Sequence, residues 1–288
     1  MADPRDKHLE RSPAARKLAE RALVALLDAL DGEDAEIVVL GGLVPEVLVG
    51  GQDPPAPGHL GTGDVDILLV SHLTVAEDLG HVERALTTIG FEPDAGGWRW
   101  RGEIEGKAVK MEFLCDLPTA REEELVPIRG CKELRANNLR GTGYVAADWA
   151  WEPLRAPLPD GRVTEVRARF AKLGGYLLSK LVAARSREAD KDFYDLVYVL
   201  IHNRAGGPSQ AAAVLQDGHL RDSLEALRST LLEIGERFRV PNGLGPSGFA
   251  AQSLAFDPEL DEAGLRADAV AAVGEFLDAV ENGLRERV

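Results

Sequence analysis

Cysteine is scarce in this sequence of 288 residues, and long apolar runs are absent. Its two cysteines, Cys115 and Cys131, are too few for a disulfide framework or for a four-cysteine zinc site, so we expect two reduced thiols. No run reaches the ~18 apolar residues of a membrane-spanning helix. The amino-terminal stretch also lacks the apolar core of a signal peptide. We therefore expect a soluble, cytoplasmic protein with no membrane partner.

Basic residues are also in deficit, because 33 Lys and Arg stand against 48 Asp and Glu, for a net charge of −15. Since Lys and Arg supply phosphate affinity, this balance argues against broad DNA binding. The charge is unevenly placed. Residues 31–94 hold 13 acids and one base, whereas residues 161–202 hold 5 acids and 8 bases. A site for a metal ion and a phosphate group would need one acidic and one basic segment of this kind. The alternative is that both segments are solvated surfaces.

Apolar spacing and breaker residues predict the elements in outline. Helices are expected over about 13–30, 44–49, 77–89, 170–185, 190–201, 209–215, 220–238 and 259–284, and strands over 37–40, 65–70, 98–104 and 107–114. Prolines at 153, 157 and 159 predict a domain boundary near residue 160. The fold class expected is α+β, with a mixed sheet in a domain over 1–160, whose core is 31–116, and an all-helical domain over 161–288.

The strongest chemical signal is the pair Asp64 and Asp66, at the start of the apolar run that ends at Val70. Side chains at i and i+2 of a strand share a face, and two close carboxylates repel unless a cation lies between them. Carboxylate oxygens favour Mg²⁺ or Mn²⁺. The pattern therefore predicts a metal site. The alternative is one aspartate that ends the turn and a second that caps it.

A third carboxylate is expected from a neighbouring strand. Glu112 is favoured because an acidic residue is unusual in the middle of an apolar strand unless it has a function. Asp116, four residues further on, is the second candidate. In the alternative, Glu112 pairs with Lys110 or with a cross-strand arginine on a solvated face.

Two further features predict phosphate binding. Gly41-Gly42 ends a strand before a helix, where backbone N–H groups can approach a phosphate, although a plain turn has the same sequence. Lys180 lies on a mostly apolar helix, so its ammonium needs a phosphate or carboxylate partner unless the side chain reaches solvent.

Taken in order, these blocks resemble the DNA polymerase β-like nucleotidyltransferase fold, and most of all the AbiEii-type abortive-infection toxins. The matching blocks are Gly41-Gly42, Thr62-Gly63-Asp64-Val65-Asp66, Glu112, Lys180, Arg185 and Lys191-Asp192-Phe193-Tyr194-Asp195-Leu196. There are three departures. The 21 residues between Gly42 and Asp64 form a longer interval than usual, Gly42 replaces a serine, and Glu112 stands where Asp is more usual.

The resemblance implies a cytoplasmic enzyme that transfers NMP from an NTP, such as ATP, to an acceptor hydroxyl. Asp64, Asp66 and Glu112 would hold two Mg²⁺ or Mn²⁺ ions, with Glu112 also accepting the acceptor's proton. It further implies a toxin–antitoxin or abortive-infection setting, with RNA (for instance tRNA) or a protein as acceptor and an antitoxin as partner.

The remaining site residues bind the nucleotide in this interpretation. Gly41, Gly42 and Thr62 would contact its phosphates, Lys180 would offset charge on the leaving pyrophosphate, and Asp192 would orient Lys180. Asp195 is expected to tie two helices together. Which NTP is used, and what role residues 50–63 have, do not follow from these residues.

Three rival functions share parts of this pattern. A glycosyltransferase with Asp-x-Asp is disfavoured, because its apolar strand precedes the acidic pair, whereas here it follows. A small-molecule nucleotidyltransferase of the antibiotic-modifying type would use the same chemistry. A non-catalytic nucleotide-binding module would keep the fold without turnover.

Overall fold

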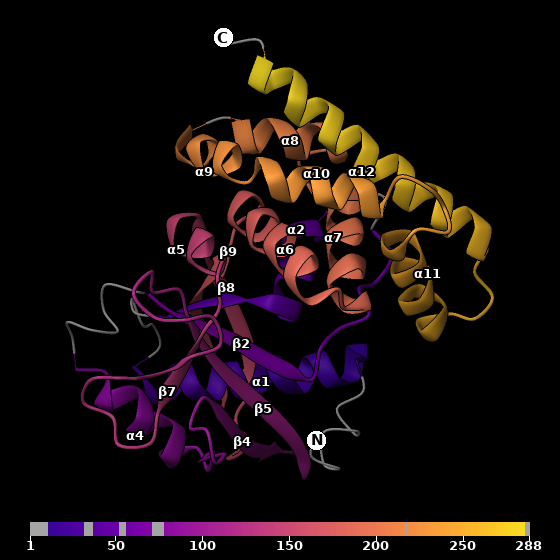
Figure 1. Ribbon diagram of the computed structural model, residues 1–288. Helices are drawn as coiled ribbons and strands as arrows, with labels where there is room; N and C mark the ends of the chain where they lie inside the picture. The colour runs from indigo at the N-terminus through magenta and orange to yellow at the C-terminus, as the bar shows by residue number, and fades with distance from the viewer. Residues whose placement is uncertain (1–10, 32–36, 52–55, 71–77, 217, 286–288) are drawn as a thin grey trace. The chain divides into compact units, whose positions relative to one another are not determined.

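The computed structural model describes residues 11–31, 37–51, 56–70, 78–216 and 218–285, and its chain divides into two compact units (Figure 1). The first unit is formed by Met1–Val44 and Gly61–Ala171, and the second by Pro45–Leu60 and Lys172–Val288. In the described part of the chain, no helix combines the length and the apolar character that crossing a bilayer requires.

One mixed sheet organises the first unit, with the strand order β3-β4-β5-β2-β1-β9-β8 and with β6 and β7 attached through β5. The strands are β1 (Ile37–Leu40), β2 (Asp64–Leu69), β3 (Glu92–Pro93), β4 (Arg99–Ile104), β5 (Lys107–Cys115), β6 (Leu125–Pro127), β7 (Arg135–Asn138), β8 (Trp149–Pro157) and β9 (Val163–Ala171). Strand β2 is antiparallel to β1 and parallel to β5, while β1 is parallel to β9. The expected α+β class with a mixed sheet is confirmed.

Helix α1 (Pro13–Ala29) packs on this sheet, along β2, β5, β8 and β9. It begins as expected, because the Ser12 hydroxyl accepts a hydrogen bond from the Ala15 N–H at 3.0 Å and Pro13 occupies the first helical position. The unit also contains the short helices α4 (Gly80–Thr88) and α5 (Gly143–Ala147) and the 3-10 turn Gly41–Leu43.

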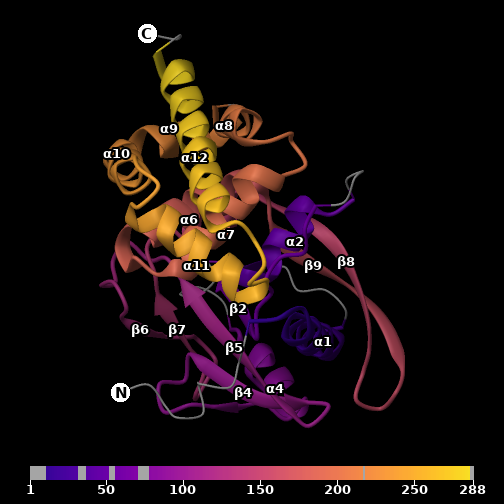
Figure 2. The ribbon, with the colours of Figure 1, turned by 90° about the vertical axis from the view of Figure 1, so that its right-hand side faces the viewer.

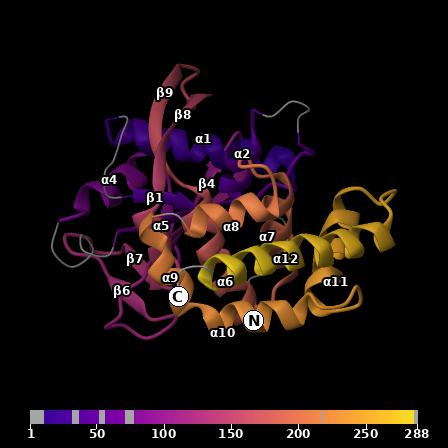
Figure 3. The same ribbon diagram turned by 90° about the horizontal axis from the view of Figure 1, so that it is seen from above.

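The second unit is helical where it is described, and its helices pack pairwise around α7 and α12 (Figure 3). The helices are α2 (Val44–Val49, which starts at the junction), α6 (Leu173–Arg187), α7 (Asp190–His202), α8 (Pro208–Gln216), α9 (Arg221–Ala226), α10 (Arg228–Arg237), α11 (Leu244–Phe256) and α12 (Glu262–Arg285). Residues 45–60 are held to α7, because Tyr198 Oη donates to Pro57 O at 2.6 Å and Leu60 N donates to Tyr194 Oη at 3.1 Å.

The division of the chain differs from the one expected at residue 160. Strands β8 and β9 form a hairpin, prominent in Figure 2, so residues 149–171 all belong to the sheet. Pro153 and Pro157, which predict a domain boundary, instead lie within β8. This is an edge strand, where a missing N–H costs no hydrogen bond within the sheet. The units therefore divide at Ala171–Lys172, and residues 45–60 lie with the helices.

Other differences are local. The single helix expected over 220–238 is broken into α9 and α10 at Leu227, and α11 was missed. The helix expected over 77–89 is described only from Gly80, and residue 77 lies outside the described residues.

Candidate functional site

Strands β2 and β5 bring the predicted carboxylates to one face of the sheet. In their parallel register, Asp64 lies opposite Lys110 and Asp66 lies opposite Glu112. Because side chains two residues apart share a face, all four project to the same side. The structure therefore aligns the Asp pair with Glu112, as the sequence predicted for neighbouring strands.

The other candidate, Asp116, has a different environment. Its Oδ2 accepts hydrogen bonds from Gly141 N at 2.8 Å and Gly143 N at 3.1 Å, and its Oδ1 lies 3.3 Å from Arg140 Nη1. These contacts hold the turn before α5. Of the two candidates for the third carboxylate, the register therefore favours Glu112.

Lys110 lies between two of these acids. Its Nζ is 3.2 Å from Asp64 Oδ2 and 3.0 Å from Glu112 Oε1. Burial disfavours the charge on this ammonium, but Glu112 and Asp64 outweigh burial and raise the pKa of Lys110 above its ordinary value. Arg99 of β4 adds a second cation, with Nε 3.0 Å from Glu112 Oε1. Both partners named in the alternative for Glu112 thus contact it.

Gly41 and Gly42 pack directly against the Asp strand. A Cβ on Gly41 would lie 1.9 Å from Asp66 Oδ2, and one on Gly42 would lie 2.5 Å from the Thr62 Cβ. Gly41 also has a φ of 71°, which glycine adopts at little cost. Thr62 in turn orders the start of β2, because its hydroxyl accepts a hydrogen bond from Asp64 N at 3.2 Å. Gly41, Gly42, Thr62 and Asp66 thus form one tightly packed corner.

This close packing leads to a stability prediction. We expect Gly41→Ala to destabilise the first unit by about 3 kcal/mol or more, because positive φ and overpacking add. Gly106, in the β4–β5 turn, is the matched control, since its φ is 69° and a Cβ there meets nothing within 4 Å. Gly106→Ala should cost only about 1 kcal/mol.

Urea denaturation followed by tryptophan fluorescence measures both variants, because all four tryptophans belong to the first unit. Equal losses in the two variants would contradict the close approach of Gly41 to Asp66.

The second predicted cluster lies in the helical unit. Lys180 Nζ, on α6, is 3.0 Å from Asp192 Oδ1 and 2.8 Å from Asp195 Oδ2, both on α7. Lys180 is 8% exposed, Asp192 is 0% exposed and Asp195 is 2% exposed, so the three charges are buried together. Burial opposes the charge on Lys180, but Asp195 and Asp192 outweigh it and raise its pKa. Asp192 and Asp195 satisfy the partner requirement of this lysine.

Two further residues complete this cluster. Arg187 Nη2 lies 3.1 Å from Asp192 Oδ1, and His59 Nε2 lies 3.0 Å from Asp195 Oδ1. The contact between His59 and Asp195 does not follow from the sequence, because no local pattern links residue 59 to residue 195. Arg185, quoted in the resemblance, is 2.7 Å from Glu233 on α10 and ties two helices together. Lys191 is exposed.

No known family, curated protein or solved structure matches this chain.

The Asp pair offers the donors that a hard divalent cation requires. Asp64 and Asp66 present carboxylate oxygens on one face at the start of β2, and the Asp64 side chain is 27% exposed. Within the described ranges, no three His, Cys, Asp or Glu side chains gather as a metal-ligating group. Glu112 instead contacts Lys110 and Arg99, and Lys110 also contacts Asp64. The pair fits a cation, and Glu112 would join it by exchanging those partners.

Proposed function

We propose that this protein is a metal-dependent nucleotidyltransferase that transfers NMP from an NTP to an acceptor hydroxyl. The observation that carries the proposal is the parallel register of β2 and β5, which aligns Asp66 with Glu112 beside Asp64 and the Gly41-Gly42 turn. A mixed sheet with a carboxylate pair at the start of a buried strand is consistent with the nucleotidyltransferase fold that the sequence resembles.

The carboxylates and glycines of this site have defined tasks in the proposal. Asp64 and Asp66 would hold Mg²⁺ or Mn²⁺, and the chemistry that a bound divalent cation supplies is neutralisation of charge on the phosphoryl oxygens. Gly41 and Gly42 would leave backbone N–H groups accessible to phosphate. Glu112 would accept the proton of the attacking hydroxyl once Lys110 no longer occupies it.

In the helical unit, Lys180 would offset charge on the leaving pyrophosphate, and Asp192 would orient Lys180. The acceptor, RNA or a protein side chain, and an antitoxin partner also belong to the proposal, because they follow only from the resemblance.

One observation favours a second candidate, a nucleotide-binding module without turnover. Lys110 Nζ and Arg99 Nε both contact Glu112 Oε1, so the carboxylate oxygen that would take the acceptor's proton is already engaged by two cations. Such a module would bind an NTP and release no pyrophosphate.

The test is transfer from each common NTP, labelled in the α-phosphate, into cell extract with Mg²⁺. The proposal expects macromolecular label and pyrophosphate release that both disappear with a chelator. Removal of the label by RNase identifies an RNA acceptor, and removal by protease identifies a protein. If the protein binds nucleotide but releases no pyrophosphate from any NTP, the result contradicts the nucleotidyltransferase proposal and supports the binding module.

A further inference from the structure

The β8–β9 hairpin carries tryptophan and arginine side chains together on one face. The register pairs Trp151 with Arg169 and Pro153 with Arg167, so Trp149, Trp151, Arg167 and Arg169 project to the same side. The opposite side is apolar and buried, formed by residues such as Phe170, which is 2% exposed. The side with the tryptophans is the more exposed one, with Arg167 exposed and both indoles half-buried.

Cation–π contacts hold the two indoles in place. The guanidinium of Arg169 lies 4.0 Å from the ring centroid of Trp149, and that of Arg167 lies 5.1 Å from the ring of Trp151. The two indole rings are 5.7 Å apart in an edge-to-face arrangement. Side chains ordered in this way lose little further entropy when a planar ligand stacks on them.

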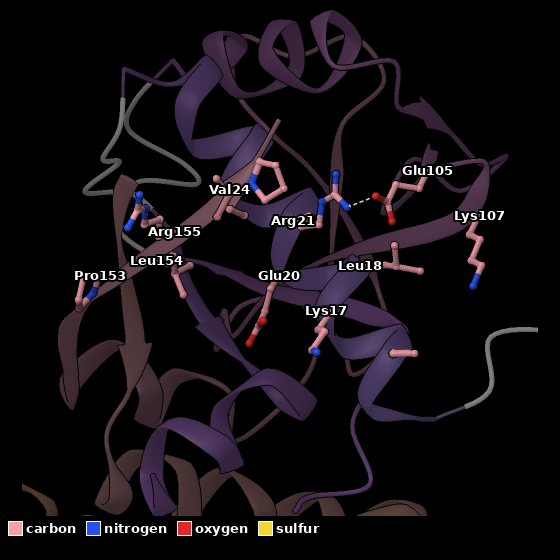
Figure 4. A pocket seen from close by; sticks show the side chains of 13 residues that line it. Lys17, Leu18, Glu20, Arg21, Val24, Glu105, Lys107, Pro153, Leu154 and Arg155 are labelled. Atoms are coloured by element: carbon pink, nitrogen blue, oxygen red, sulfur yellow. Dashed lines mark ion pairs between the residues drawn. The ribbon is translucent and has the colours of Figure 1, made fainter. Parts of the chain in front are cut away.

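Arg155, on the same side of β8, also lines a groove of about 560 Å³ (Figure 4). Lys17 and Arg21 enter this groove from α1, and Lys107 enters from the start of β5. Arg21 is ion-paired with Glu105, whereas the side chains of Lys17, Lys107 and Arg155 form no ion pair or hydrogen bond with the residues that the structure describes. Glu165 lies opposite Arg155 in the hairpin register. The groove therefore places Arg155 near basic side chains of α1 and β5, with Glu20 and Glu105 also in its lining.

We propose that this surface, formed by Trp149, Trp151, Arg155, Arg167 and Arg169, binds single-stranded nucleic acid. Unpaired bases stack on aromatic rings whatever their sequence, and the phosphates between them require basic groups nearby. The proposal goes beyond the nucleotidyl transfer proposed above, since binding here uses neither Asp64 nor Asp66.

Other polyanions fit this surface less well. A peptide added as a further strand would need donors along the free edge of β8, and Pro153 and Pro157 have no N–H to offer. An acidic peptide would engage the cations and leave both indoles unused. Duplex nucleic acid presents phosphates but hides the faces of its bases. Single-stranded nucleic acid is the ligand that uses both the rings and the charges.

The test uses the full-length protein and a fluorescein-labelled oligouridylate of about 20 nucleotides, a length that exceeds the usual site size. We expect saturable binding by fluorescence anisotropy, quenching of intrinsic tryptophan emission, and affinity that falls as salt rises. Trp151→Ala should weaken binding about 5- to 100-fold, as loss of one stacking ring does, and Trp151→Phe should restore most of it.

Two variants keep this test independent of folding defects. Arg155→Glu changes an exposed side chain and should weaken binding at least about tenfold at low salt. Trp98→Ala is the control, because it removes another indole stacked by an arginine, with Arg99 4.1 Å from its ring, and should leave binding unchanged. The proposal is overturned if Trp151→Ala and Arg155→Glu both bind like the wild type. Equally tight binding of polyglutamate or tripolyphosphate would overturn it too, since neither ligand carries bases.

Discussion

Replacing Asp66 by alanine is expected to abolish nucleotidyl transfer and to leave the first unit folded. Asp66 lies opposite Glu112 in the β2–β5 register and against Gly41, at the centre of the proposed site. Loss of a group that merely supports a metal ligand costs about 10- to 100-fold in activity, so loss of a direct ligand should cost at least about a hundredfold. The measurement is pyrophosphate release and label transfer with Mg²⁺.

Glu103→Ala is the matched control for this variant. Glu103 is an exposed acid on β4, so its removal changes the net charge by the same amount away from the Asp pair. Its transfer rate should equal that of the wild type. Asp66→Ala with more than about a tenth of wild-type transfer would rule out Asp66 as a ligand.

Mn²⁺ binding separates metal affinity from turnover. Titration followed by electron paramagnetic resonance should show weaker Mn²⁺ binding to Asp66→Ala than to Glu103→Ala. Unchanged Mn²⁺ binding together with lost transfer would place the metal elsewhere.

Replacing Lys180 by methionine is expected to destabilise the helical unit by about 3–5 kcal/mol, because it leaves two buried carboxylates without their shared cation. Asp192 is the more affected of the two, since its Oδ2 accepts no hydrogen bond from the residues described and its Oδ1 depends on Lys180 and Arg187. Adding Asp195→Asn to Lys180→Met should restore part of the stability, because it removes one of the unpaired charges.

Far-UV circular dichroism during denaturation measures this effect, while tryptophan fluorescence reports the first unit in the same sample. Lys191→Met is the control. It removes an exposed lysine of α7 that has no ion pair or hydrogen bond within the described ranges, and it should change stability by less than about 0.5 kcal/mol. A loss below about 1 kcal/mol in Lys180→Met would show that the carboxylates find other partners.

The elements with strong local signals were predictable from the sequence. Ser12-Pro13 starts α1 because a hydroxyl cap and a proline both favour the first helical turn. Glu105-Gly106 makes the β4–β5 turn, and both residues have positive φ, as a two-residue hairpin turn requires. The Asp pair was placed correctly on one face of β2, because strand periodicity alone decides that.

The remaining features depend on contacts between distant residues. Nothing near residue 59 predicts a contact with Asp195, and nothing near Gly50 shows that residues 45–60 join the helices. Pro153 and Pro157 were interpreted as breakers, because a sequence does not reveal which strand will lie at the edge of a sheet. Lys110 alternates in phase with Glu112, but whether a lysine neutralises a site or faces solvent depends on the neighbouring strand.

The assignment of residues 45–60 to the helical unit has a consequence for how the protein can be dissected. A fragment over 172–288 keeps α7 but loses His59 and the Pro57 carbonyl, so Asp195 and the Tyr198 hydroxyl lose partners that they have in the intact chain. A cut at Lys172 therefore separates the helices from part of their own unit. Residues 45–60 can be added to this fragment as a separate peptide. The affinity of the peptide for the fragment then measures how much residues 45–60 contribute to the stability of the helical unit.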